Sequence, residues 1–173
     1  MTDWLSSGTW DLGVPERKRF ESISNVIVGD SLCDLGCRDA TLSLTYARDH
    51  PKVRVVGVDL SEDIDWANMM AAKLGIDNFV GMKMDLFDAE SLGQFDTVVI
   101  SEVLEHLPPN RVEEAYTLAQ RMAKKRLIVT TPANSHISDP GHKSVYYREQ
   151  FLRDENHWIL GMPHLWIGFY TDK

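Results

Sequence analysis

Carboxylate and imidazole side chains gather in one short segment of the sequence, Glu102-x-x-Glu105-His106. Among these residue types, histidine has the reference pKa closest to neutral, which makes His106 a candidate general base, with Glu105 as a second catalytic candidate. The alternative is a structural role, because Pro108 and Pro109 follow and favour the start of a helix. In that case, His106 would pack or cap there.

The same segment carries the donor atoms of a divalent-metal site. Two carboxylates and one or two imidazoles suit Mg²⁺, Mn²⁺ or Fe²⁺, and a bound metal would lower the pKa of an acceptor hydroxyl group. The ligands would come from Glu102, Glu105, His106 and a distant histidine. Further polar candidates follow the next predicted strand: Asn134, His136 and His142.

A second set of candidates lies at the ends of three predicted strands. Gly36 follows Asp34 at a strand-to-helix junction, where a small residue lets the backbone approach a ligand and free N–H groups favour its anionic end. Asp59 ends the next strand, where Rossmann-type proteins accept hydrogen bonds from ribose hydroxyls, and Asp85 follows the third. Together they predict one crevice for a nucleotide-like cofactor. Taken singly, Gly36 also fits a turn, and Asp59 fits a helix N-cap beside Ser61.

Alternating strands and helices must position these residues. The predicted strands are 31–35, 53–59, 78–84, 95–101 and 125–131, and the predicted helices are 15–28, 39–49, 62–74 and 108–123. Nearly continuous apolar runs such as Val53–Val58 indicate strands covered on both faces. This pattern is typical of a doubly wound α/β fold with a parallel sheet.

The end of the chain departs from this alternation. A last helix at about 148–154 precedes two β-rich segments, 157–160 and 165–170, which are separated by Gly161-Met162-Pro163. So short a connection cannot hold a crossover, so it predicts an antiparallel hairpin. We therefore expect a mostly parallel, seven-stranded sheet with this hairpin at its edge.

Length and composition favour a single domain over residues 1–173. Residues 1–14, with Trp4 and Trp10, read as an irregular arm that could act as a lid. The net charge of -8, from 26 acidic and 18 basic residues, disfavours an extended nucleic acid as a partner. Only Cys33 and Cys37 occur, which indicates reduced thiols in a cytoplasmic protein, and no apolar run is long enough for a membrane span.

With these motifs in place, the chain resembles the class I, Rossmann-like, S-adenosylmethionine-dependent methyltransferases over about residues 31–155. The segments that carry the resemblance are Cys33–Cys37, Val58-Asp59, Met84-Asp85 and Phe95–Leu107. It implies cofactor contacts along three strand ends and the end of a fourth: Asp34 and Gly36 at the methionine moiety, Asp59 at the ribose, Asp85 and Leu86 at the adenine, and Ser101 at the methionine end, with Cys37 and Leu60 as further cofactor contacts. Arg38 and Ala40 occupy the second and third glycine positions of the family motif, which puts the strength of cofactor binding in question.

A second resemblance concerns the metal hypothesis. The Glu-x-x-Glu-His segment and the stretch Gly141–Phe151 are similar to those of the small-RNA 3′-terminal 2′-O-methyltransferases, which would make His142 the fourth metal ligand. Against an RNA substrate stand the acidic net charge and the occurrence of similar segments in small-molecule methyltransferases of the ubiquinone type.

The sequence thus predicts a methyltransferase that uses S-adenosylmethionine and acts on a small-molecule or exposed acceptor, with oxygen favoured as the acceptor atom. Two alternatives stay open: a metal-assisted RNA 2′-O-methyltransferase using Mg²⁺ or Mn²⁺, and a catalytically degenerate cofactor-binding subunit. A homo-oligomer or a partner subunit could complete the site. A short-chain dehydrogenase fits less well, because Tyr146 and Tyr147 lack a lysine four residues later.

Overall fold

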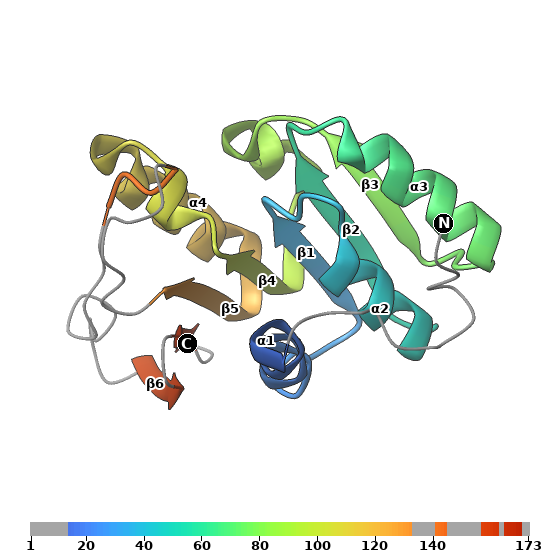
Figure 1. The fold of residues 1–173 in the computed structure, drawn as a ribbon, viewed down its shortest axis with the longest axis horizontal. Helices are drawn as coiled ribbons and strands as arrows, with labels where there is room; N and C mark the ends of the chain where they lie inside the picture. Colours follow the sequence, from blue (N-terminus) through green and yellow to red (C-terminus); the bar gives the residue numbers. More distant parts are fainter. Residues whose placement is uncertain (1–13, 133–140, 145–156, 163–164, 171–173) are drawn as a thin grey trace.

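The computed structural model describes residues 14–132, 141–144, 157–162 and 165–170 (Figure 1). Its main elements, in chain order, are α1 (Val14–Ser24), β1 (Ser31–Leu35), α2 (Thr41–Asp49), β2 (Arg54–Asp59), α3 (Asp63–Leu74), β3 (Phe79–Lys83), β4 (Phe95–Ser101), α4 (Val112–Met122), β5 (Ala123–Pro132), β6 (His157–Met162) and β7 (Leu165–Tyr170). Three short 3-10 helices connect them: η1 (Leu86–Leu92), η2 (Leu104–His106) and η3 (Pro109–Arg111).

The parallel part of the sheet has the strand order β3-β2-β1-β4-β5. β1 lies between β2 and β4, so the chain reverses its direction of winding between these two neighbours. Ligands of open α/β sheets bind at the carboxyl ends of the strands beside such a reversal. The predicted doubly wound α/β architecture is confirmed for these strands.

Helices cover both faces of this sheet, and each face has its own hydrophobic core. Leu32 and Val99 pack on one face with residues of α1, α2 and α3. Cys33 and Val98, their chain neighbours, point to the other face and pack with residues of α4. Figure 1 shows α2 and α3 beside β1, β2 and β3, with α4 beside β4.

The last two described strands are antiparallel. β7 pairs with β5 and with β6, and Gly168 lies opposite both Val129 and Ile159. The strand order therefore continues as β5-β7-β6. The predicted lid at 1–14 (apart from Val14) and the predicted helix at 148–154 lie outside the described residues.

Some element ends differ from the sequence expectations. α1 ends at Ser24 rather than near Val28. The reasons are a run of β-branched residues and the side chain of Thr97, which binds the N–H and the carbonyl of Val28. The predicted helix 108–123 divides into η3 and α4, and η1 was not predicted. Among the described helices, none has the length and apolar content that crossing a membrane requires.

Candidate functional site

A cavity of about 560 Å³ opens at the carboxyl ends of the parallel strands. Every position that the sequence predicts as a cofactor contact lines it: Asp34, Gly36, Cys37, Asp59, Leu60, Asp85, Leu86 and Ser101. Of the catalytic and metal candidates, Glu102 and His106 also line it. The fold therefore brings strand ends that are up to 67 residues apart in sequence onto one surface.

The loop after β1 passes close to β4, and glycine is required there. Gly36 has a φ of 76°, which side chains rarely adopt, and a Cβ atom at this position would overlap Val103. The N–H groups of Gly36 and Cys37 both donate to the carbonyl oxygen of Val58, at 2.7 and 3.1 Å. Arg38 has a φ of 51°, a left-handed backbone that glycine adopts more readily than other residues. The arginine therefore occupies a glycine position of the family motif at the cost of backbone strain.

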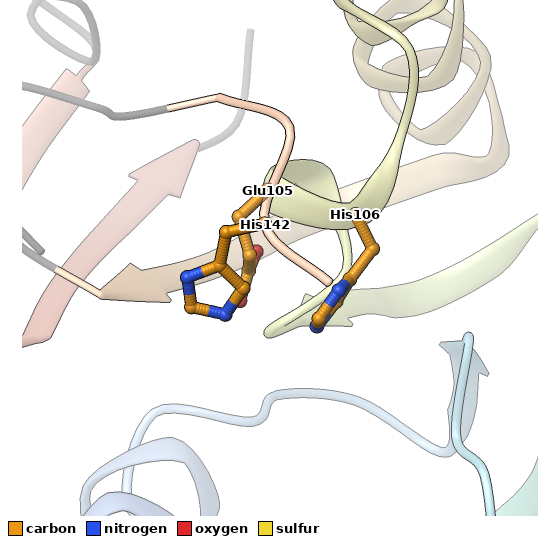
Figure 2. A group of neighbouring side chains, drawn as sticks. All are labelled: Glu105, His106 and His142. Carbon is orange, nitrogen blue, oxygen red and sulfur yellow. The ribbon is translucent and has the colours of Figure 1, made fainter. Parts of the chain in front are cut away.

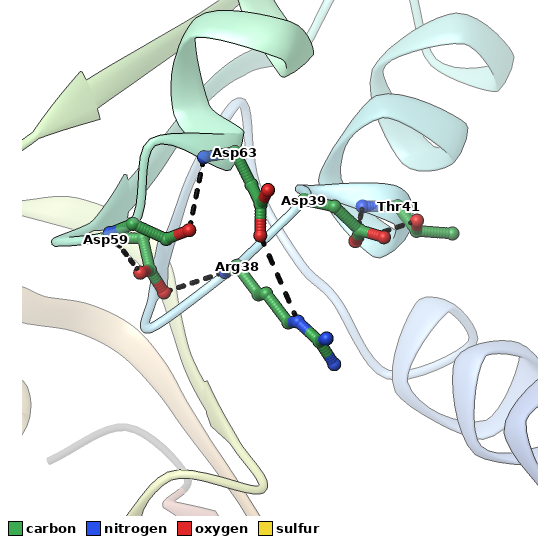
Figure 3. A network of polar contacts seen from close by, with 6 residues as sticks. Arg38, Asp39, Thr41, Asp59 and Asp63 are labelled. Carbon is green, nitrogen blue, oxygen red and sulfur yellow. Dashed lines mark hydrogen bonds and ion pairs between the residues drawn. The ribbon is translucent and has the colours of Figure 1, made fainter.

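Asp59 connects the ends of β1 and β2 (Figure 3). One carboxylate oxygen accepts the N–H of Arg38 at 2.7 Å, and the other accepts the N–H of Ser61 at 2.8 Å. The N-cap of α3 is Glu62, so Asp59 does not cap that helix. The guanidinium of Arg38 is 83% exposed and lies 4.0 Å from Asp63. Asp59 thus holds the glycine loop and still faces the cavity.

Asp34 is a buried carboxylate in the cavity wall. The hydroxyl group of Ser43 donates to it at 2.5 Å. Burial raises the pKa of Asp34 from 3.8 to about 6, against the opposing effect of the Ser43 hydrogen bond. A cationic ligand beside Asp34 would favour its ionised form.

The end of β3 forms a second wall of the cavity. A carboxylate oxygen of Asp85 accepts the N–H of Phe87 at 3.0 Å and so caps η1. Leu86 and Phe87 line the cavity beside it. The guanidinium carbon of Arg111 lies 3.7 Å from the centre of the Phe87 ring.

Glu102 follows β4 in a left-handed conformation, with a φ of 58°. Its carboxylate accepts the hydroxyl of Thr130 at 2.8 Å and lies 3.4 Å from the guanidinium of Arg19, a residue of α1. Burial raises the pKa of Glu102, while Arg19 opposes this shift. The ion pair therefore joins α1 to the end of β4 at the cavity.

Glu105, His106 and His142 offer ligand atoms that all lie within 4.8 Å of one another. Figure 2 shows the first two on the turn after β4 and His142 on the segment that packs against it. Two hydrogen bonds hold that segment: Lys143 N–H donates to Glu105 O at 2.7 Å, and His106 Nδ1 lies 3.0 Å from Gly141 O. Glu102, a predicted ligand, is outside this group.

Glu105 is the buried member of the group, at 1% exposure. The hydroxyl of Thr131 contacts one carboxylate oxygen at 3.3 Å, and the other oxygen has no hydrogen-bond partner among the described residues. Burial, with a smaller contribution from Glu102, raises the pKa of Glu105 to about 7. Asn134 and His136 lie outside the described residues.

Sequence reasoning missed two features of the site. Arg19 lines the cavity, although helix periodicity marked only the apolar positions of that helix, such as the neighbouring Phe20. A charged residue next to its apolar face was the available signal for Arg19. The packing of Arg111 on Phe87 gave no signal, because the two residues belong to different elements.

Comparison with known proteins agrees with this geometry. A family model described as a methyltransferase domain matches residues 28–158. The magnesium protoporphyrin IX methyltransferase of Arabidopsis thaliana is 30% identical over 105 residues, which are 60% of this chain and 33% of that protein. The ubiquinone biosynthesis O-methyltransferase of Shewanella pealeana is 33% identical over 92 residues, 51% of this chain and 38% of that protein. The chain thus spans 33% to 38% of the length of these curated relatives.

Solved structures share the fold. The magnesium protoporphyrin IX methyltransferase of Synechocystis, solved with bound S-adenosylmethionine, has a TM-score of 0.73 and 21% sequence identity, covering 92% of this chain and 81% of that one. This likeness supports the Rossmann-like architecture.

Proposed function

This chain belongs to the methyltransferase-domain family, and on that premise we propose that it transfers a methyl group from S-adenosylmethionine to an oxygen atom of a small-molecule acceptor. The observation that carries the proposal is that Asp34, Gly36, Asp59 and Asp85, at neighbouring strand ends, line one shared cavity. The similarity to O-methyltransferases supports oxygen as the acceptor atom.

The residues present fit this cofactor. The cavity of about 560 Å³ lies within the range of small-molecule sites. We assign the ribose hydroxyls to Asp59, the adenine to Asp85 and Leu86, and the methionine moiety to Asp34, Gly36, Cys37 and Ser101, with Leu60 beside the ribose. When bound, the cofactor supplies a methyl group on a positively charged sulfur.

Arg19 is the further cofactor residue in this proposal. Its Nε atom is buried without a hydrogen-bond partner among the described residues, and its Nη1 atom lies 3.4 Å from Glu102. A guanidinium in a cavity wall with an unused N–H group favours a carboxylate ligand. We therefore assign the carboxylate of the methionine moiety to Arg19.

His106 is the proposed general base. It lines the cavity near Ser101 and Glu102, and its Nδ1 atom contacts a carbonyl oxygen, which leaves Nε2 free to accept a proton from an acceptor hydroxyl. Glu105, which precedes His106 in the chain, is the second catalytic residue of this proposal and supports His106 in its role as the base. Alignment of the acceptor and exclusion of water supply the rest of the rate enhancement.

A second candidate function, metal-assisted methylation of a hydroxyl group, is favoured by the convergence of Glu105, His106 and His142. One carboxylate and two imidazoles suit a divalent transition metal, and the orphaned oxygen of Glu105 fits a ligand role. The contact of His106 Nδ1 with Gly141 matches the second-shell bond typical of ligating histidines. A bound Mn²⁺ or Mg²⁺ would lower the pKa of the acceptor hydroxyl.

The C-terminal strands belong to the same proposal. We interpret β6 and β7 as the antiparallel edge of a seven-stranded sheet, and the pairing of Val129 with Gly168 supports this. An RNA acceptor and a non-catalytic subunit remain the alternatives. The net charge of -8 argues against the first. The cavity that persists beside Arg38, lined by the predicted cofactor contacts, argues against the second.

A methyl-transfer assay with labelled S-adenosylmethionine and a panel of catechols, phenols and carboxylic acids tests the proposal. Transfer to an oxygen acceptor is the expected result. Transfer only to nitrogen acceptors, or no binding of S-adenosylhomocysteine at all, would contradict it.

A further inference from the structure

Phe87 lies where two parts of the cavity wall meet. It lines the cavity from η1, and its backbone N–H is fixed by Asp85 at 3.0 Å. The guanidinium of Arg111 covers the ring at 3.7 Å, yet Arg111 itself does not line the cavity. Phe87 therefore contacts both the cavity and an arginine that is not among the residues lining it.

The guanidinium of Arg111 is itself held in place. Its Nε donates to one carboxylate oxygen of Glu114 at 2.5 Å, and Nη2 donates to the other at 3.2 Å. A bidentate pair fixes the plane of a guanidinium, which is the geometry for stacking on an aromatic face. The ion pair with Glu114 thus holds the guanidinium of Arg111 in its position over Phe87.

We propose that Arg111 is a positioning residue for cofactor recognition, which holds the Phe87 ring as an aromatic wall against the adenine. This inference rests on the proposed function, which assigns the adenine to the neighbouring Asp85 and Leu86. A flat base gains from contact with an aromatic ring, and the attraction between guanidinium and ring keeps Phe87 from turning away.

The contact also joins the two halves of the site. Phe87 belongs to η1, which follows β3. Arg111 is the last residue of η3, which follows β4, and His106 and Leu107 line the cavity just before η3. A ring fixed between them sets the adenine and the catalytic turn relative to each other.

The test is calorimetric titration of S-adenosylhomocysteine and of 5′-methylthioadenosine into the wild type and R111M. The matched control is R121M, because Arg121 makes the same kind of bidentate pair, with Glu90 at 2.8 and 3.1 Å, and in the described structure contacts no aromatic ring. We expect R111M to bind both ligands about threefold to fivefold more weakly, the factor of a cation–π contact at a partly exposed site. R121M should bind both as the wild type does.

An equal loss of affinity for both ligands would place the effect of Arg111 at the adenine end, because 5′-methylthioadenosine lacks the amino-acid end of the cofactor. A second arm adds F87L. In that background, R111M should cause no further loss, whereas independent losses that multiply would overturn the inference. Affinities of R111M equal to those of R121M would also overturn it and leave the proposed function intact. A wild type that binds neither ligand would overturn the proposed function and this inference with it.

Discussion

The Nδ1 atom of His106 lies 3.0 Å from the backbone oxygen of Gly141. A carbonyl oxygen can only accept, so Nδ1 is the donor in this contact, and in the neutral ring the lone pair is then on Nε2. The turn after β4 and the segment 141–144 therefore orient this ring and select one tautomer of its neutral form. Such a ring can accept a proton or bind a metal ion without rearranging.

Replacing His106 should separate catalysis from cofactor binding. We expect H106A to lower methyl turnover about 10²- to 10⁴-fold, the usual contribution of a general base. Affinity for S-adenosylhomocysteine should change less than twofold. Steady-state kinetics and calorimetry measure the two effects. The control is H50A, because His50 stacks on Tyr46 away from the cavity. Turnover of H106A equal to that of H50A would refute the role of His106.

The buried carboxyl of Asp34 makes the stability of the protein depend on pH. Its pKa in the folded protein, about 6, exceeds the ordinary value of 3.8. The stability that the protonated carboxyl contributes is thus fully present below pH 3.8 and is lost as the pH rises through about 6. We expect the free energy of unfolding of D34N to exceed that of the wild type by about 2 to 3 kcal/mol at pH 8. At pH 4 this excess should be absent.

Urea denaturation at both pH values measures this difference. D63N is the control, because Asp63 is half exposed and pairs only loosely with Arg38. A difference between D34N and the wild type that does not change with pH would contradict the explanation. D34N should also weaken the binding of S-adenosylmethionine, since the charged form of Asp34 complements the cationic sulfur.

The left-handed backbone of Arg38 predicts an unusual order of stabilities. R38G and R38A both remove the exposed side chain, but only glycine relieves the strain at a φ of 51°. R38G should therefore be about 1 kcal/mol more stable than R38A. Thermal denaturation of both variants measures the difference. Equal stabilities would mean that Arg38 does not adopt this conformation.

Metal binding by the group of Glu105, His106 and His142 predicts a separate calorimetric signal. Titration of Mn²⁺ into chelator-treated protein should give one site, which H142A weakens about 10-fold or more. E102Q should have a smaller effect than E105Q, because Glu102 is bound to Thr130 and Arg19. The variant H50A serves as the control. Wild-type affinity in H142A would exclude this group as the metal site.

Much of the architecture could be predicted from the sequence because it depends on local patterns. Alternating apolar runs fixed the parallel strands within one or two residues, and the acids at their ends identified the cavity. Asp59 and Asp85 could be found because a parallel sheet brings carboxyl ends together whatever the loops between them do.

The contacts that depend on how elements pack could not be predicted in this way. Glu102 has the residue type of a metal ligand, but a left-handed backbone turns its carboxylate to Arg19 on α1. The resemblance of the Gly141–Phe151 segment to a known family did point to His142, but the two hydrogen bonds that hold its segment against the turn depend on packing. Spacing in the sequence alone indicates neither the turn of Glu102 nor these hydrogen bonds.

Titration of S-adenosylhomocysteine into three proteins decides whether the carboxyl ends of these strands bind S-adenosylmethionine. We predict micromolar binding by the wild type and by D63N, and at least about 10-fold weaker binding by D59N, which loses a charged acceptor for the ribose. Circular dichroism should confirm that all three proteins are folded. If the wild type shows no binding, or D59N binds as tightly as D63N, the account is contradicted.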